Sequence, residues 1–147
     1  MLHYEPIIYT IDISASAATI WEALTEPTQL QQWMTENRLD ITTTWQPGTP
    51  IIIRGTSPDH SFENRGTIMQ FQPEAVLEYT HLSSLSQLQD AVENYTSIKF
   101  QLSPTENGTH LQITLSNFPT ESIYRHFAFY WRIAIHSLKK YVENNNF

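Results

Sequence analysis

ESIYRHFAFYWRIAIHSLKKYVEN, residues 121 to 144, is the stretch that decides the fold. No Gly or Pro interrupts it, and at 100° per residue its apolar side chains gather on one narrow stripe, which predicts a long amphipathic helix. Such a helix spans about 35 Å, roughly the width of a small domain, so the rest of the chain must supply the surface that buries the stripe. The stripe consists of Tyr124, Ala128, Trp131, Ile135, Leu138 and Val142, with Phe127, Ala134 and Tyr141 along its edge.

Both ends of this helix carry boundary signals. Thr120 and Glu121 are typical of a helix start, where a side-chain oxygen caps free N–H groups and an acidic residue is favoured. Lys139 and Lys140 are expected in the last turns, where positive charge is favourable.

Upstream of the helix the apolar period is mostly two, which is typical of half-buried strands. Two short helices, 18–25 and 27–33, are expected after the first strand, with Ser14 or Ser16 as cap and Glu26–Pro27 between them. Composition predicts turns at 55–60 and 104–108, and a loop or marginal helical turn over 83–93. Gly66 indicates a bulge, which leaves either Ile68 or Met69 facing inward. We expect strands over residues 7–14, 38–45, 50–54, 62–72, 76–82, 94–103 and 111–115.

The predicted fold class is therefore α+β, a curved antiparallel sheet of six to seven strands covered by the C-terminal helix. A length of 147 residues, with 40% hydrophobic and 12% aromatic residues, predicts one globular domain over 1–147. Eight basic against 15 acidic residues give a net charge of −7, which argues against nucleic-acid binding. The absence of Cys excludes disulfides and thiol chemistry. Without a basic N-terminal start or a run of about 20 apolar residues, we expect no signal peptide, no membrane insertion and a cytoplasmic protein.

Residues 15–33, ASAATIWEALTEPTQLQQW, resemble the opening of the activator-of-Hsp90-ATPase-homologue-like branch of the START-like (Bet v 1-like) superfamily. A Trp-containing helix, a Leu-Thr-acid-Pro turn and a second Trp follow one another there. The resemblance continues in order through Pro47–Gly48, Gly66, LEYTH at 77–81, TSIKFQLSP at 96–104 and GTHLQITLSNFP at 108–119, and ends with Trp131 and LKKY at 138–141. It implies a helix-grip fold, in which the long helix lies across the sheet over an elongated apolar cavity.

Three positions depart from the family's usual pattern. Thr49 replaces a second Gly after Pro-Gly, His81 replaces an aromatic residue, and Tyr130 replaces a Gly before the helix Trp. These departures indicate changes in the cavity lining or in the packing of the helix.

The candidate cavity residues are those on predicted inward faces, where plain core packing is the alternative role for each one. An apolar pocket with a few polar groups is the usual form of a small-molecule site. The candidates are Trp33, Ile53, Tyr79, His81, Phe100, Phe127, Trp131 and Ile135.

Catalytic and metal signals are weak by comparison. No nucleophile elbow, phosphate-binding loop or dinucleotide-binding glycine pattern occurs. His126 and His136 are about 15 Å apart along one helix, too far to share an ion, and His3, His60, His81 and His110 lack ligand-like spacing, so we expect no metal and no cofactor.

The polar residues near the expected cavity, His81 and the pair Glu63 and Arg65, each have two alternative roles. His81 is either a partly buried residue with one hydrogen-bond partner or a catalytic base. Glu63 and Arg65 share one strand face, where they form a solvated pair or a pair across the cavity mouth that touches a ligand.

The residue pattern and the family resemblance together imply three alternative functions. The first is binding of a small hydrophobic molecule or lipid without catalysis. The second is an enzyme of the cyclase or hydrolase type that uses His81 with Glu63 or Arg65. The third is a module that acts on an Hsp90-type chaperone ATPase. Phe129 and Ile133, on the outer side of the helix, indicate a homodimer contact or cover by the 83–93 loop.

Overall fold

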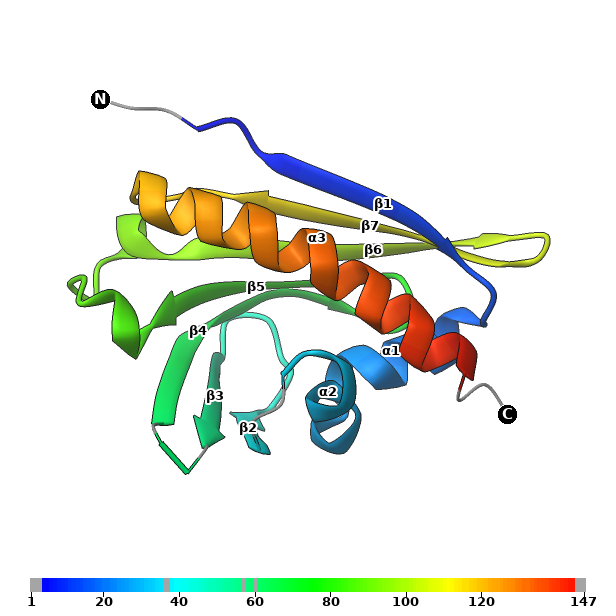
Figure 1. The fold of residues 1–147 in the computed structure, drawn as a ribbon, viewed down its shortest axis with the longest axis horizontal. Coiled ribbons are helices and arrows are strands. Elements are labelled where there is room, and N and C mark those ends of the chain that lie inside the picture. The colour runs from blue at the N-terminus through cyan, green and yellow to red at the C-terminus, as the bar shows by residue number, and fades with distance from the viewer. Residues whose placement is uncertain (1–3, 36–37, 57, 60, 145–147) are drawn as a thin grey trace.

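The computed structural model describes residues 4–35, 38–56, 58–59 and 61–144. It is an α+β fold in which a curved antiparallel sheet lies against a long C-terminal helix, with two short helices after the first strand (Figure 1). The seven strands follow the order β1-β7-β6-β5-β4-β3-β2, and the predicted fold class is confirmed. The elements are β1 (Ile7–Ile13), α1 (Ala17–Thr25), α2 (Pro27–Trp33), β2 (Arg38–Thr43), β3 (Pro50–Thr56), β4 (Ser61–Gln72), β5 (Val76–Ser83), the 3-10 turns η1 (Ser84–Ser86) and η2 (Val92–Asn94), β6 (Thr96–Thr105), β7 (Gly108–Ser116) and α3 (Glu121–Asn144).

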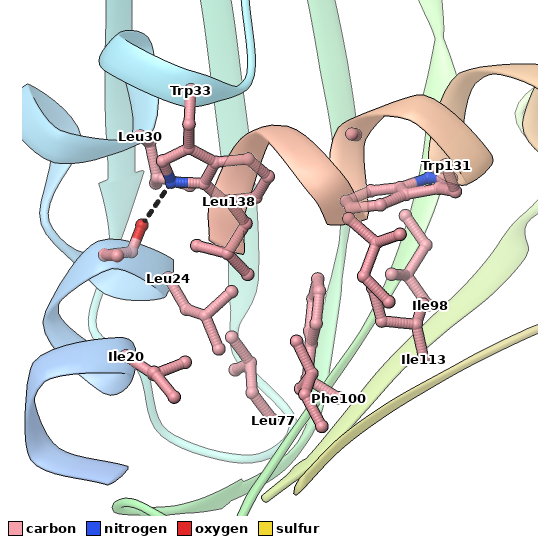
Figure 2. Packing of buried hydrophobic residues seen from close by; sticks show 14 of the residues in the cluster. Ile20, Leu24, Leu30, Trp33, Leu77, Ile98, Phe100, Ile113, Trp131 and Leu138 are labelled. Atoms are coloured by element: carbon pink, nitrogen blue, oxygen red, sulfur yellow. Dashed lines mark hydrogen bonds between the residues drawn. The ribbon is translucent and has the colours of Figure 1, made fainter. Parts of the chain in front are cut away.

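The two short helices are joined by a proline and tied together by a tryptophan. Ser16 caps α1, since its hydroxyl accepts the backbone N–H of Thr19 (3.2 Å). Near the end of α1, the carbonyl of Ala23 would normally accept from the residue four positions on, but that residue is Pro27, which has no N–H. The indole N–H of Trp33 supplies the missing donor at 2.8 Å (Figure 2). Trp33, a residue of α2, thus caps the C-terminal end of α1.

Helix α3 crosses the sheet diagonally (Figure 1). Its buried residues, among them Phe127 and Trp131, face inward. Trp131 is 2% exposed and Ile135 is 3% exposed, as the period of 3.6 predicted. The Thr120 hydroxyl accepts the backbone N–H of Ile123 (3.1 Å), which confirms the expected cap.

The end of α3 agrees with the prediction. The helix ends at Asn144, and Lys139 and Lys140 lie in its last two turns, just before the final one. Lys139 contacts Glu143 (3.2 Å) and donates to the carbonyl of Asp12 (2.6 Å). The Glu143 carboxylate in turn accepts the backbone N–H of Ser14 (2.8 Å). These bonds fasten the end of β1 to the last turns of α3.

The bulge in β4 does not lie at the predicted position. Its pairing with β5 shifts between Ile68 and Gln70, so Met69 is the extra residue. Ile68 is therefore the inward residue, with 0% exposure, while Met69 is 51% exposed. Gly66 serves a different need: a Cβ there would lie 1.7 Å from the carbonyl oxygen of Thr80 on β5. Only glycine permits the two strands to approach so closely.

Several strands differ in length from the expectation, since β3 and β7 are longer and β2 is shorter. β3 continues through Gly55 and Thr56, which were predicted to form the start of a turn. Residues 57 and 60 of that predicted turn lie outside the described residues, as does His3. β6 and β7 run into the predicted 104–108 turn until Thr105 pairs with Gly108. Trp45, predicted as a strand position, follows β2 with a φ of 61° and stacks on Phe71 at 5.5 Å.

The packed core lies between α1, α2, the second half of α3 and the middle of the sheet (Figure 2). Leu138 on α3 is fully buried, and Leu111, Ile113 and Leu115 on β7 are fully buried as well. Side chains fill this half of the interior. The other half, under the beginning of α3, is different.

Candidate functional site

A cavity of about 520 Å³ lies between the first half of α3 and strands β3 to β6. Its walls are mainly apolar and aromatic, and exposed lining residues such as Leu85 and Ser122 mark its opening to the surface. The mouth is bounded by the segment from η1 to η2 and by the first turns of α3. The lining consists of Met34, Thr35, Leu39, Ile53, Phe62, Asn64, Tyr79, His81, Leu82, Ser83, Leu85, Ser86, Asn94, Thr96, Ile98, Ser122, Ile123, His126, Phe127, Tyr130 and Trp131.

The cavity lies where the inward side chains of the central strands become more polar and, on β4 and β6, smaller. At the end of β5 and β6 nearest α1, the inward residues are large, as in the pair Leu77 and Phe100. At the other end, the pair His81 and Thr96 replaces them, and Asn64 occupies the matching end of β4. The backbone of α3 comes nearest to β1, α1 and α2, so it does not descend to close this gap.

The structure separates the sequence-predicted site residues into two groups. Ile53, Tyr79, His81, Phe127 and Trp131 line the cavity together, from β3, β5 and α3.

The remaining three predicted site residues belong to the packed core. Trp33 bonds to the end of α1, Phe100 lies under the Trp131 ring with centroids 5.6 Å apart, and Ile135 is buried in the second half of α3. Their burial was predicted correctly, but they do not line the cavity.

Sequence reasoning missed several polar lining residues, notably Asn64, Thr96, His126 and Tyr130. The Tyr130 hydroxyl donates to the carbonyl of Met34 at the end of α2, which ties α3 to α2 beside the cavity. The sequence signal that could have identified Tyr130 as a lining residue was its departure from the family pattern. Two of the three departures, His81 and Tyr130, line the cavity, while Thr49 lies in the turn before β3.

Tyr79 carries a polar group into this apolar space. The residue is 5% exposed, and its hydroxyl has no hydrogen-bond partner among the described residues. No fully buried side-chain oxygen or nitrogen among the described residues lacks a partner, so the unpaired hydroxyl is not fully enclosed by protein atoms, and the Tyr79 side chain lines the cavity. Burial, together with neighbouring Tyr130, raises the pKa of Tyr79, which therefore stays protonated at neutral pH.

His81 lies two residues further along β5, with the edge of its ring against Phe127 at a centroid distance of 5.3 Å. Burial lowers its pKa to about 4, and nearby His126 acts in the same direction, because a second positive charge would be repelled. The imidazole is thus neutral near pH 7 and offers one donor and one acceptor. No Asp or Glu is found among the described lining residues to orient it as a catalytic base.

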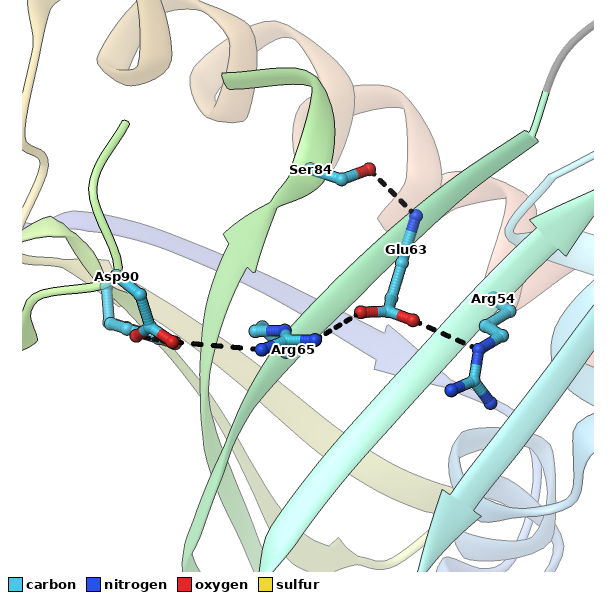
Figure 3. A network of polar contacts seen from close by, with 6 residues as sticks. Arg54, Glu63, Arg65, Ser84 and Asp90 are labelled. Atoms are coloured by element: carbon cyan, nitrogen blue, oxygen red, sulfur yellow. Dashed lines mark hydrogen bonds and ion pairs between the residues drawn. The ribbon is translucent and has the colours of Figure 1, made fainter. Parts of the chain in front are cut away.

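Glu63 and Arg65 form a pair, but on the outer face of the sheet and not across the cavity. Since Phe62 and Asn64 line the cavity, the alternation of β4 turns Glu63 and Arg65 outward. Glu63 contacts Arg65 at 2.6 Å and Arg54 at 3.0 Å (Figure 3). The hydrogen bond from Arg65 is the main cause that lowers the pKa of Glu63.

This outer network also connects β4 to the segment from η1 to η2, which borders the mouth of the cavity. The backbone N–H of Glu63 donates to the Ser84 hydroxyl (3.0 Å), and Arg65 lies 3.8 Å from Asp90 (Figure 3). The predicted use of Glu63 or Arg65 inside an enzyme cavity is therefore wrong, because neither residue reaches it.

The described residues contain neither a metal-binding cluster nor a membrane-spanning helix. Within 4–35, 38–56, 58–59 and 61–144, no group of three or more His, Asp or Glu side chains could hold a metal ion. No helix in those ranges has the length and apolar character needed to cross a membrane.

A curved antiparallel sheet that grips a long C-terminal helix over an apolar cavity defines a helix-grip domain of the START-like (Bet v 1-like) class. Residues 14–143 match the family described as "Activator of Hsp90 ATPase homolog 1-like protein", and the chain belongs to this family. The resemblance drawn from the sequence is thus confirmed. No curated protein sequence matches the chain significantly.

Solved structures share the fold over nearly their whole length. A protein from Cytophaga hutchinsonii is 28% identical, with 98% of this chain and 97% of that chain covered and a TM-score of 0.79. The Aha1 dimer from Colwellia psychrerythraea is 24% identical, with coverages of 98% and 100% and a TM-score of 0.73. A protein from Mesorhizobium loti is 18% identical, with coverages of 97% and 100% and a TM-score of 0.76.

Proposed function

We propose that this protein binds a small, predominantly apolar molecule or lipid in the cavity under the first half of α3. The observation that carries the proposal is the unfilled space of about 520 Å³, which lies within the usual range of ligand pockets. Aromatic and aliphatic walls supply apolar contact area, while a few polar groups orient the ligand. The residues proposed to contact it are Ile53, Tyr79, His81, Phe127 and Trp131.

The absence of an oriented base among the described lining residues favours binding over catalysis. A neutral imidazole without a carboxylate partner holds no acid–base pair of the kind that hydrolysis or cyclisation uses.

A filled-cavity variant tests the proposal. Asn64→Phe places a ring in the cavity, and Gln72→Phe at the exposed end of the same strand is the matched control. A panel of lipids and aromatic compounds is screened by thermal shift, and native mass spectrometry examines protein purified from cells. At 100 times its Kd a ligand stabilises by about 2.7 kcal/mol, an increase of roughly 5–10 °C in Tm. We expect this shift in the wild type and in Gln72→Phe but not in Asn64→Phe. The proposal fails if no compound shifts the wild type more than Asn64→Phe.

A second candidate function is interaction with a chaperone ATPase or with a second copy of the chain. Phe129 and Ile133 are 61% and 50% exposed on the outer side of α3, and Arg132 lies 5.8 Å from the centre of the Phe129 ring. The family description refers to Hsp90 ATPase activation, and the Colwellia structure is a dimer. Sedimentation of wild type and Phe129→Ser tests the dimer, while co-purification with an Hsp90-type chaperone and its ATPase rate test the alternative.

A further inference from the structure

The charges of the chain restrict what the cavity can hold. All eight Lys and Arg residues lie in the described part, and none of them lines the cavity. Arg54 and Arg65 are occupied on the outer face of the sheet, and Arg125 pairs with Glu121 on the exposed side of α3. The full set is Arg38, Arg54, Arg65, Lys99, Arg125, Arg132, Lys139 and Lys140.

An anionic group in the interior would therefore find no Lys or Arg beside it, and His126, the other lining histidine, is exposed to solvent on α3. Transfer of a carboxylate from water into an apolar site without a counter-charge is strongly unfavourable. His81 does not supply the charge, because burial lowers its pKa to about 4 and leaves it neutral at pH 7. A cationic group fares no better, since no Asp or Glu occurs among the described lining residues.

The polar groups that remain suit an uncharged oxygen. The Tyr79 hydroxyl is an unpaired donor at a residue that is 5% exposed, on the central strand of the sheet. Tyr130, the other cavity tyrosine, already donates to Met34. Beside Tyr79, the neutral ring of His81 provides a further donor or acceptor.

We infer that the cavity selects an uncharged ligand, and that a carbonyl or hydroxyl oxygen of this ligand accepts a hydrogen bond from Tyr79 with His81 beside it. This inference rests on the proposed binding function and adds the ligand's chemical class. A free fatty acid or other carboxylate is accordingly a poor ligand, and an aromatic or aliphatic ketone, ester or alcohol is a good one.

Three probes with the same ring system test the inference by calorimetry at pH 7.5. They are naphthalene, 2-acetylnaphthalene and 2-naphthoate, of which the last two are close in shape and differ in charge. We expect 2-acetylnaphthalene to bind at least roughly 10-fold more tightly than 2-naphthoate, because the carboxylate loses its hydration without a cationic partner. Tyr79→Phe should weaken 2-acetylnaphthalene roughly 2- to 12-fold, the effect of one hydrogen bond, and leave naphthalene unchanged.

Tyr130→Phe is the matched control, because it removes a hydroxyl from the same cavity that is already bonded to the protein. It should not change the ratio of 2-acetylnaphthalene to naphthalene affinity. Equal or tighter binding of 2-naphthoate overturns the selection against charge. An equal effect of Tyr79→Phe on naphthalene and 2-acetylnaphthalene overturns the assigned hydrogen bond. In both cases the proposed binding function stands. Wild-type protein that binds none of the three probes overturns the inference, and the panel of lipids and aromatic compounds then decides the binding function separately.

Discussion

Helix α3 has a packed half and a half that covers a cavity, and paired alanine substitutions should reveal the difference. Leu138 in the packed half is 0% exposed. Leu138→Ala removes three buried carbons, worth about 2.4 kcal/mol at ~0.8 kcal/mol each, and leaves a void that the surrounding core fills incompletely. The expected loss in the free energy of unfolding is about 3–4 kcal/mol, or roughly 6–16 °C in Tm.

Ile123→Ala makes a comparable change in the other half. Ile123 is half-buried and lines the cavity, so the lost carbons already border open space on one side. No new void is created inside packed atoms, and the expected loss is about 1 kcal/mol.

Urea unfolding of the wild type and both variants, followed by circular dichroism, gives the two values. An unchanged m-value would show that only the stability has changed. If Ile123→Ala costs as much as Leu138→Ala, the first half of α3 is packed like the second. The cavity, and the binding function inferred from it, would then be wrong.

Three further predictions concern other parts of the interior. Trp33→Phe leaves the Ala23 carbonyl without its donor and should cost about 1–3 kcal/mol in urea unfolding, while a cost near zero would contradict the capping role. Gly66→Ala forces a Cβ against the Thr80 carbonyl and should lower Tm, with loss of amide-exchange protection centred on the β4–β5 pair; unchanged protection there would refute the close approach. The pKa of His81 is about 4 in the folded state and about 6.5 in the unfolded state, so the unfolded state binds more protons between these pH values. The free energy of unfolding should therefore fall as the pH drops below 6.5, by up to about 3 kcal/mol at pH 4. His81→Gln should remove this part of the pH dependence, and a variant with the wild-type slope would refute it.

The fold was largely predictable because each element carries its own period. The stripe of α3 required no knowledge of its partner, and the Ser16 cap and Pro27 break are local signals. The position of the bulge was not predictable, because the sequence signal lies at Gly66 and nothing in the sequence marks Met69 as the extra residue. Which of them breaks the register depends on how closely β5 approaches, and this is a property of the folded sheet.

The cavity was predictable as a type of feature but not residue by residue. Burial looks alike in sequence whether a side chain faces a void or another side chain, so Trp131 and Phe100 were predicted on the same basis. The difference arises from what lies opposite, such as the small Thr96 at one end of β6. Positions that depart from the family pattern were more informative, since His81 and Tyr130 both line the cavity.

The bonds that fasten β1 to α3 have a kinetic consequence. Lys139 reaches Asp12, and Glu143 reaches Ser14 across 129 positions of the chain. Contacts of such high sequence separation must wait until the intervening polypeptide is organised, which is typical of slow-folding topologies. A nascent or proteolysed chain without residues 121–144 would expose the apolar inner face of its sheet to water, and aggregation would then compete with folding.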